Sequence, residues 1–282
     1  MAHRRSPYRF PCPMLSAPST RWWLPGLLFS LVSIAQAELT LSAIFSDHMV
    51  LQRHQPCPVW GWDKPGTHIT VTFASQQHEA VAGPDGRWSV SLDPMEANAE
   101  PASLAISGTG RKVITDVLVG EVWLCSGQSN MAYKLPSDYN GDLAALAAAN
   151  DQIRFIKLPA VGTQDPQPTF RGAWSVADPE TVRRTSAVGY YFGDYLQRTL
   201  QVPIGLIDNS WGGSAIDAWI DRRALETAPR FTELIRETVE RETFFATPAA
   251  TEVFTRDLAA WQAKTDASEF AGPQPKSPEA WF

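Results

Sequence analysis

The feature that most constrains this chain's fold is the stretch 120–131, where an apolar run stops abruptly at small and polar residues. The run is typical of a strand and contains Val117, Leu118, Val119, Val122, Trp123 and Leu124. A buried parallel strand that ends in a tight loop presents a side chain at the carboxyl edge of its sheet. The pattern predicts such a strand and loop, with Ser129 as the candidate nucleophile.

Composition restricts the classes of function. The 282 residues suffice for one large domain or two smaller ones, and 44% hydrophobic with 19% charged residues is typical of a globular chain. The net charge is −6, from 24 Lys and Arg against 30 Asp and Glu. An acidic chain without a basic stripe argues against nucleic acid or an anionic membrane as a partner.

Residues 1–37 are typical of a secretory signal peptide. They contain four arginines and no acidic residue, then an apolar run over 22–34, and then Ala35-Gln36-Ala37 before Glu38. A membrane anchor is the alternative, but the run is short against the ~20 residues of a spanning helix. We expect cleavage and export to the periplasm or the extracellular space, with no membrane contact afterwards. Cleavage of residues 1–37 removes four arginines, so the mature chain has 20 Lys and Arg against 30 Asp and Glu and a net charge of −10.

Residues 38–115 are predicted to form a small all-β sandwich domain. Short apolar runs recur at 39–44, 49–52, 59–62, 68–73, 88–92, 103–106 and 113–119. Turn residues separate these runs, and Gly83-Pro84-Asp85-Gly86 predicts a hairpin. The domain either contacts carbohydrate or packs against the next domain, and we favour packing.

From residue 116 to 282 the pattern changes to alternating strands and helices. Strands are predicted at 117–125, 153–158 and 203–207, and helices at 142–149, at 186–200 with Ser186 or Thr185 as cap, and from 216. Residues 222–270 are charged and helical. The alternation predicts an α/β fold, a parallel sheet with helices on both faces.

A second strand-end loop supports Ser129. A serine nucleophile needs a base, and backbone N–H groups that bind the developing oxyanion. Gly212 and Gly213 follow the strand at 203–207, and the carboxyl ends of parallel strands share one edge of the sheet. Taken alone, a serine in such a sequence is most often an ordinary turn residue, and two adjacent glycines most often make a tight bend. No metal-ligand spacing and no phosphate-binding loop is present in the sequence.

Four stretches together resemble the sialate O-acetylesterase-like branch of the SGNH hydrolases, whose fold is flavodoxin-like. They are 120–131 with Gly-Gln-Ser-Asn-Met, 45–53, 186–192, and 203–219 with Ser-Trp-Gly-Gly-Ser. The resemblance implies a serine esterase that removes O-acetyl groups from a sugar and needs no cofactor. Ser129 corresponds to the nucleophile, and the N–H groups of Ser129 and of Gly212 or Gly213 correspond to the oxyanion hole.

The chain departs from the family after residue 220. Family members continue with a Gln-Gly-Glu-Ser-Asn-like motif and an Asp-x-x-His-type motif that supplies the base. Neither is present, and the five histidines, His3, His48, His54, His68 and His78, all precede Ser129. We therefore expect an α/β domain that lacks its carboxyl-terminal part and is inactive as this chain. A non-catalytic protein that binds acetylated glycans is the alternative.

Three further expectations concern the cysteines, the tryptophans and solubility. Sequence leaves open whether Cys57 and Cys125 pair, and Cys12 belongs to the signal peptide. The 11 tryptophans are expected mostly in the core, with some lining a sugar-binding cleft. An incomplete parallel sheet leaves a central strand unpaired at its edge, which predicts poor solubility.

Overall fold

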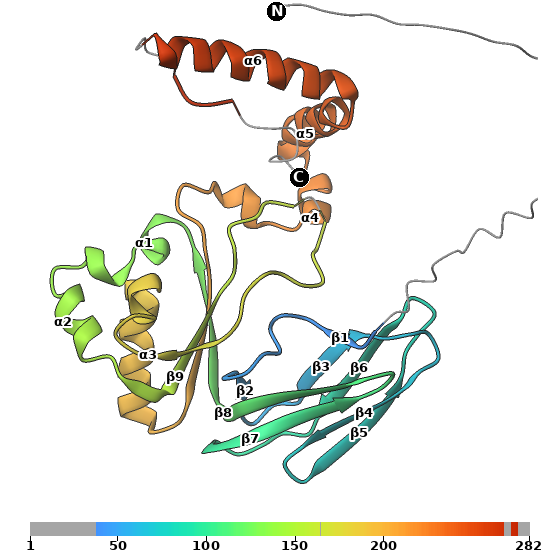
Figure 1. Cartoon of the computed structure of the whole chain (residues 1–282), viewed down its shortest axis with the longest axis vertical. Helices are drawn as coiled ribbons and strands as arrows, with labels where there is room; N and C mark the ends of the chain where they lie inside the picture. The colour runs from blue at the N-terminus through green and yellow to red at the C-terminus, as the bar shows by residue number, and fades with distance from the viewer. Residues whose placement is uncertain (1–37, 164, 268–271, 276–282) are drawn as a thin grey trace, which may run out of the picture. The chain divides into compact units, whose positions relative to one another are not determined.

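The computed structural model describes residues 38–163, 165–267 and 272–275. The predicted signal peptide, residues 1–37, lies outside this part of the chain. In the described part the protein is a mixed α/β structure in which a multi-stranded sheet is combined with helices (Figure 1). None of the described helices is both long enough and apolar enough to cross a membrane.

Two sheets are formed by the described residues. The smaller is antiparallel, in the order β1-β3-β6, with bounds Thr40–Leu41, Cys57–Trp62 and Arg87–Leu92. The larger has the order β10-β9-β11-β8-β7-β4-β5, and β2 also pairs with β8. Its bounds are Ser175–Ala177, Asn150–Lys157, Ile204–Ser210, Arg111–Gly127, Asn98–Ser107, His68–Phe73 and Gln76–Val81, with β2 at Val50–Gln52.

The long strand β8 joins the two parts of the large sheet. Its first half pairs with β7 in antiparallel direction, and its second half pairs with β11 in parallel direction. The predicted boundary between residues 115 and 116 therefore falls inside one continuous strand. A separate all-β domain stays a prediction.

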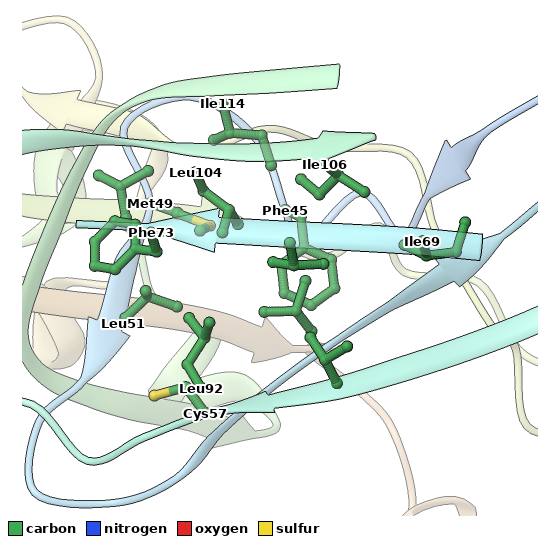
Figure 2. Packing of buried hydrophobic residues seen from close by; sticks show 14 of the residues in the cluster. Phe45, Met49, Leu51, Cys57, Ile69, Phe73, Leu92, Leu104, Ile106 and Ile114 are labelled. Atoms are coloured by element: carbon green, nitrogen blue, oxygen red, sulfur yellow. The ribbon is translucent and has the colours of Figure 1, made fainter. Parts of the chain in front are cut away.

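One hydrophobic cluster fills the space between the small sheet and the antiparallel half of the large one. Ile69 and Phe73 come from β4, Leu104 and Ile106 from β7, and Leu92 from β6 (Figure 2). These side chains are at most 2% exposed. Alternate residues of each strand supply them, because side chains point to opposite faces of a sheet.

The parallel part of the sheet carries helix α3, Ala187–Leu200, on one face. Ser186 caps the helix by accepting a hydrogen bond from the N–H of Gly189 at 3.0 Å, which confirms one of the two predicted caps. Gly189 and Gly193 face the sheet, where added Cβ atoms would lie 3.2 Å from Cys125 Sγ and 2.7 Å from Leu206 Cδ1. The two glycines thus let the helix approach β8 and β11 closely.

The remaining helices are short or lie late in the chain. They are α1 (Ser129–Ala132), α2 (Gly141–Leu146), α4 (Arg222–Glu226), α5 (Thr232–Phe245) and α6 (Pro248–Asp266). Four 3₁₀ turns occur among the described residues, at Leu135–Ser137, Val182–Arg184, Ile216–Trp219 and Pro229–Phe231. The predicted charged helical segment is confirmed by α4, α5 and α6, whereas the helix predicted from residue 216 is only a 3₁₀ turn.

The sequence analysis missed two strands and made one wrong prediction in the sheets. The polar strand β5 was not predicted, and it pairs with β4 in antiparallel direction. The turn at Gly83–Gly86 does not close a hairpin, since it leads from β5 in the large sheet to β6, which pairs with β3 in the small sheet. Strand β10, antiparallel to β9, was also not predicted. Both cysteines in the described region, Cys57 and Cys125, are free and buried.

Candidate active site

The nucleophile candidate lies at the turn where β8 passes into α1. Gly127 ends the strand at a φ of 134°, a conformation that side chains disfavour, and Ser129 is the first residue of α1. The N–H of Ala132 donates to the carbonyl of Gln128 at 2.9 Å and closes the turn. Ser129 is exposed, so the strand-end loop presents its hydroxyl to solvent, as the sequence predicted.

The loop after β11 lies beside this turn. Strand β11 pairs with β8 as far as Ser210 opposite Gly127, and the N–H of Trp211 donates to the carbonyl of Gly127 at 2.9 Å. A Cβ atom on Gly212 would lie 3.9 Å from Ser129 Cα. Gly213 has a φ of 81°, and a Cβ there would meet no atom within 4 Å. The structure therefore brings Gly212 next to Ser129, while Gly213 makes the bend.

Ser129 has a hydrogen-bond partner that is not a base. Its Oγ donates to Gln128 Oε1 at 2.7 Å. A neutral amide oxygen accepts a hydrogen bond but does not take up a proton near neutral pH. In this arrangement the hydroxyl is positioned but not activated.

The histidines of the described region belong to the part of the chain before residue 79 and form no hydrogen bond with Ser129. His48 Nδ1 lies 2.6 Å from Asp116 Oδ2, which is eleven residues before the end of β8. At a rise of about 3.3 Å per residue, these eleven residues of strand measure roughly 36 Å along the chain. His54 contacts Glu96, and His68 and His78 lie on β4 and β5. None of these four serves Ser129 as a general base.

A charged cluster that the sequence did not indicate anchors the end of β11. Lys157 Nζ donates to Asp208 Oδ1 at 2.8 Å, to the Ser210 carbonyl at 2.9 Å and to Ser210 Oγ at 3.0 Å. Asp208 is 5% exposed and also accepts hydrogen bonds from the N–H and Oγ of Ser210. Burial raises the pKa of the neighbouring Cys125 thiol, and the charge of Asp208 adds to the shift. The cluster fixes the backbone that leads into Trp211 and Gly212.

Aromatic side chains flank the glycine loop. Trp211 and Trp219 are 42% and 38% exposed, whereas Trp88 and Trp174 are buried in the core. Ser214 Oγ links the exposed pair by accepting from Trp219 Nε1 and donating to the Trp211 carbonyl, each at 2.8 Å. The structure thus confirms tryptophans in the core, and a sugar-binding role of the exposed pair stays a prediction.

This chain is similar to known carbohydrate esterases. Residues 119–246 match the family model described as carbohydrate esterase, sialic acid-specific acetylesterase. The chain is 32% identical over 230 residues to the sialate O-acetylesterase of Mus musculus, a match that covers 72% of this chain and 42% of that protein. The sialate O-acetylesterase of Homo sapiens is 31% identical over 231 residues, covering 72% of this chain and 44% of that protein.

A solved structure is similar in fold as well as in sequence. The crystal structure of a carbohydrate acetylesterase from Xanthomonas citri aligns with a TM-score of 0.65 and 39% identity. The alignment covers 67% of this chain and 43% of that one. This chain therefore spans less than half the length of each of these relatives.

Proposed function

The part of the chain that matches these proteins belongs to the sialate O-acetylesterase-like branch of the SGNH hydrolases, and on that premise we propose that it forms the nucleophile-bearing part of an exported serine esterase that removes O-acetyl groups from carbohydrates. The observation that carries the proposal is the position of Gly212 beside Ser129 at the carboxyl edge of the parallel strands. This is the place where a serine and backbone N–H donors meet in acyl transfer.

The chemistry of this site follows from the two loops. Ser129 Oγ attacks the acetyl carbonyl carbon and transfers its proton to a general base. The N–H groups of Ser129 and of Gly212 or Gly213 stabilise the oxyanion, and the sugar oxygen leaves with the proton. Water then attacks the acetyl-serine and releases acetate. We place the base on the part of the relatives' length that this chain does not span, so this chain alone is expected to be inactive.

Export is part of the proposal. It is supported by the arginines, the apolar run and Ala35-Gln36-Ala37 in residues 1–37. Amino-terminal sequencing of the protein recovered from the periplasm or the medium tests it. A mature protein that begins at Glu38 supports export, and a protein that keeps its first residues in the cell contradicts it.

Hydrolysis of p-nitrophenyl acetate tests the esterase. We expect no turnover by the chain alone, and turnover when it is supplemented with the part of the Xanthomonas citri acetylesterase outside the matched region. Ser129→Ala is expected to abolish that turnover, since it removes the attacking oxygen. Ser137→Ala, a change at another exposed serine, is the matched control and should retain it. Activity that survives Ser129→Ala would refute the assignment.

A second candidate is a non-catalytic protein that binds acetylated glycans. It is favoured by the exposed Trp211 and Trp219 and by the hydrogen bond that ties Ser129 to Gln128. Equilibrium binding of an acetylated oligosaccharide, with no acetate released by the supplemented protein, would support this candidate. Release of acetate in the same experiment would exclude it.

A further inference from the structure

The small sheet has one face that the hydrophobic cluster does not use. Residues of β3 and β6 alternate between buried and more exposed positions, because side chains point to opposite faces of a sheet (Figure 1). The buried residues, such as Val59, belong to the hydrophobic cluster. On the other face, Trp60 lies opposite Ser89. The next pair on that face is Trp62 opposite Arg87.

A cavity that is open to solvent lies at these pairs, and we name it the β3–β6 cavity. Its volume is about 390 Å³. Binding sites for small molecules typically measure about 300–1,000 Å³, so this volume is sufficient for a small organic ligand. The cavity belongs to the small sheet and is separate from the candidate active site at the ends of β8 and β11. The residues that line it are Trp60, Gly61, Arg87, Trp88 and Ser89.

Arg87 brings a positive charge to the β3–β6 cavity. Among the residues that the structure describes, it forms no ion pair with a carboxylate. Its guanidinium carbon lies 5.9 Å from the centroid of the Trp62 ring, a cation–π contact that helps to hold the head group in place. Asp85 accepts a hydrogen bond from the backbone N–H of Arg87 at 3.0 Å, not from the guanidinium. The planar fork of guanidinium donors, which matches a carboxylate, is therefore available to a ligand.

Aromatic and polar groups form the rest of the cavity wall. Trp60 is half-buried and packs edge to face on Phe45, with ring centroids 4.6 Å apart, and this contact orients its ring. Such a flat ring can stack on the apolar face of a sugar. Ser89 is exposed, and its hydroxyl both donates and accepts hydrogen bonds. Trp88 is 3% exposed, and its Nε1 is the one buried side-chain nitrogen or oxygen of the described residues that lacks a hydrogen-bond partner.

These groups select among the classes of ligand. A nucleic acid needs a row of Lys and Arg, and the cavity has one cation. A purely apolar ligand would leave the guanidinium and the hydroxyl without partners. A metal ion is not favoured, because no carboxylate, imidazole or thiolate is among the residues that line the cavity. An aromatic ring beside a guanidinium and a hydroxyl matches a sugar ring that carries both hydroxyl groups and an acidic group.

We propose that the β3–β6 cavity is a carbohydrate-binding site, separate from the candidate active site, for saccharides that carry a carboxylate. The carboxylate binds the guanidinium of Arg87, the sugar ring stacks on Trp60, and its hydroxyl groups bond to Ser89. Of the two roles considered for the β region, this one is contact with carbohydrate rather than packing alone. The inference goes beyond the proposed function and does not depend on it, because no residue of the cavity belongs to the two strand-end loops.

Isothermal titration calorimetry of the full chain measures this binding. The probes are trimers of galacturonate, glucuronate and mannuronate. Their neutral counterparts, trimers of galactose, glucose and mannose, lack only the carboxylates. We expect one-to-one binding of at least one acidic trimer, at least about tenfold tighter than that of its neutral counterpart. This binding should weaken as the salt concentration rises, because salt screens the attraction between the carboxylate and Arg87.

Two variants locate the contact. Arg87→Gln removes the charge at an exposed position, and Trp60→Leu removes the aromatic ring while keeping an apolar neighbour for Phe45. Each is expected to weaken binding at least about tenfold. Arg111→Gln changes another exposed arginine, on β8, and should bind as the unaltered chain does. Ser129→Ala should also bind unchanged. Unchanged circular dichroism of the variants shows that the fold persists.

The outcomes separate this inference from the proposed function. Absence of binding by all three acidic trimers overturns the inference, and so does equal binding of the neutral trimers. Binding that survives Arg87→Gln overturns it as well. Binding that Trp211→Ala removes while Arg87→Gln retains it assigns the sugar to the glycine loop instead. The esterase is tested by the acetate that the supplemented protein releases and this site by calorimetry of the chain alone, so either can fail without the other.

Discussion

Replacement of Lys157 by methionine tests whether the charged cluster supports the glycine loop. Methionine keeps the length and the apolar stem of lysine but removes the ammonium group. Three hydrogen bonds are lost, one to Asp208 Oδ1 and two to Ser210. The Asp208 carboxylate then stays buried, with only the N–H and Oγ of Ser210 as donors.

The magnitude follows from the burial of the two partners. Breaking a fully buried ion pair costs about 3–5 kcal/mol, because a charge is left unpaired in a medium of low dielectric constant. The side chain of Lys157 is 44% exposed, so water screens part of the attraction. The two remaining donors to Asp208 reduce the cost further. We expect the free energy of unfolding to fall by about 2 kcal/mol.

Equilibrium urea unfolding of the full chain measures this change. The midpoint should fall while the slope stays constant, since the surface exposed on unfolding is unchanged. Asp208→Asn and the double variant complete a cycle, in which a coupling of about 1–2 kcal/mol is expected for directly bonded groups. A loss below about 0.5 kcal/mol for Lys157→Met would refute the reasoning, because exposed surface pairs contribute about 0–1 kcal/mol and this pair would then be no stronger than they are.

Two further predictions concern the junction where β8 changes partner. Arg154 is 3% exposed and donates to Asp116, and this hydrogen bond lowers the pKa of the Asp116 carboxyl. Asp116→Asn should therefore cost about 2–3 kcal/mol in urea unfolding at pH 7. This difference in the free energy of unfolding between the unaltered chain and the variant is fully present above the ordinary carboxyl pKa of about 3.9. It is lost as the pH falls through the lower pKa that Asp116 has in the folded protein. Gly120→Ala places a Cβ 1.9 Å from the Pro203 carbonyl oxygen and should lower the free energy of unfolding by about 3 kcal/mol. Gly110→Ala is the control, because a Cβ there meets no atom within 4 Å and should leave stability unchanged. Thermal unfolding of both variants measures the effect.

Sequence periodicity predicted helix α3 but not which side of it is buried. The apolar residues at helical spacing include Val188, Phe192 and Tyr195, and these lie on the solvent side. The buried side consists largely of small residues such as Gly189 and Gly193. A glycine gives no apolar signal, because its contribution is the close approach of two backbones. Only the position of the sheet could reveal that face.

The errors in the β region have a similar origin. Strand β5 has the sequence Gln-Gln-His-Glu-Ala-Val, which carries little apolar pattern because it lies at the end of the large sheet and none of its residues is fully buried. The turn at Gly83–Gly86 was recognised correctly as a turn. A turn motif does not specify whether the next strand returns to the same sheet or crosses to another, so the predicted hairpin was wrong.

The candidate site was predictable to the extent that it depends on topology. Parallel strands end at one edge, so the proximity of Ser129 and Gly212 followed from two strand-end loops. The cluster of Lys157 and Asp208 depends instead on register, since these residues are opposite each other on β9 and β11. Two charged residues at separate strand ends carry no sequence signal for that pairing.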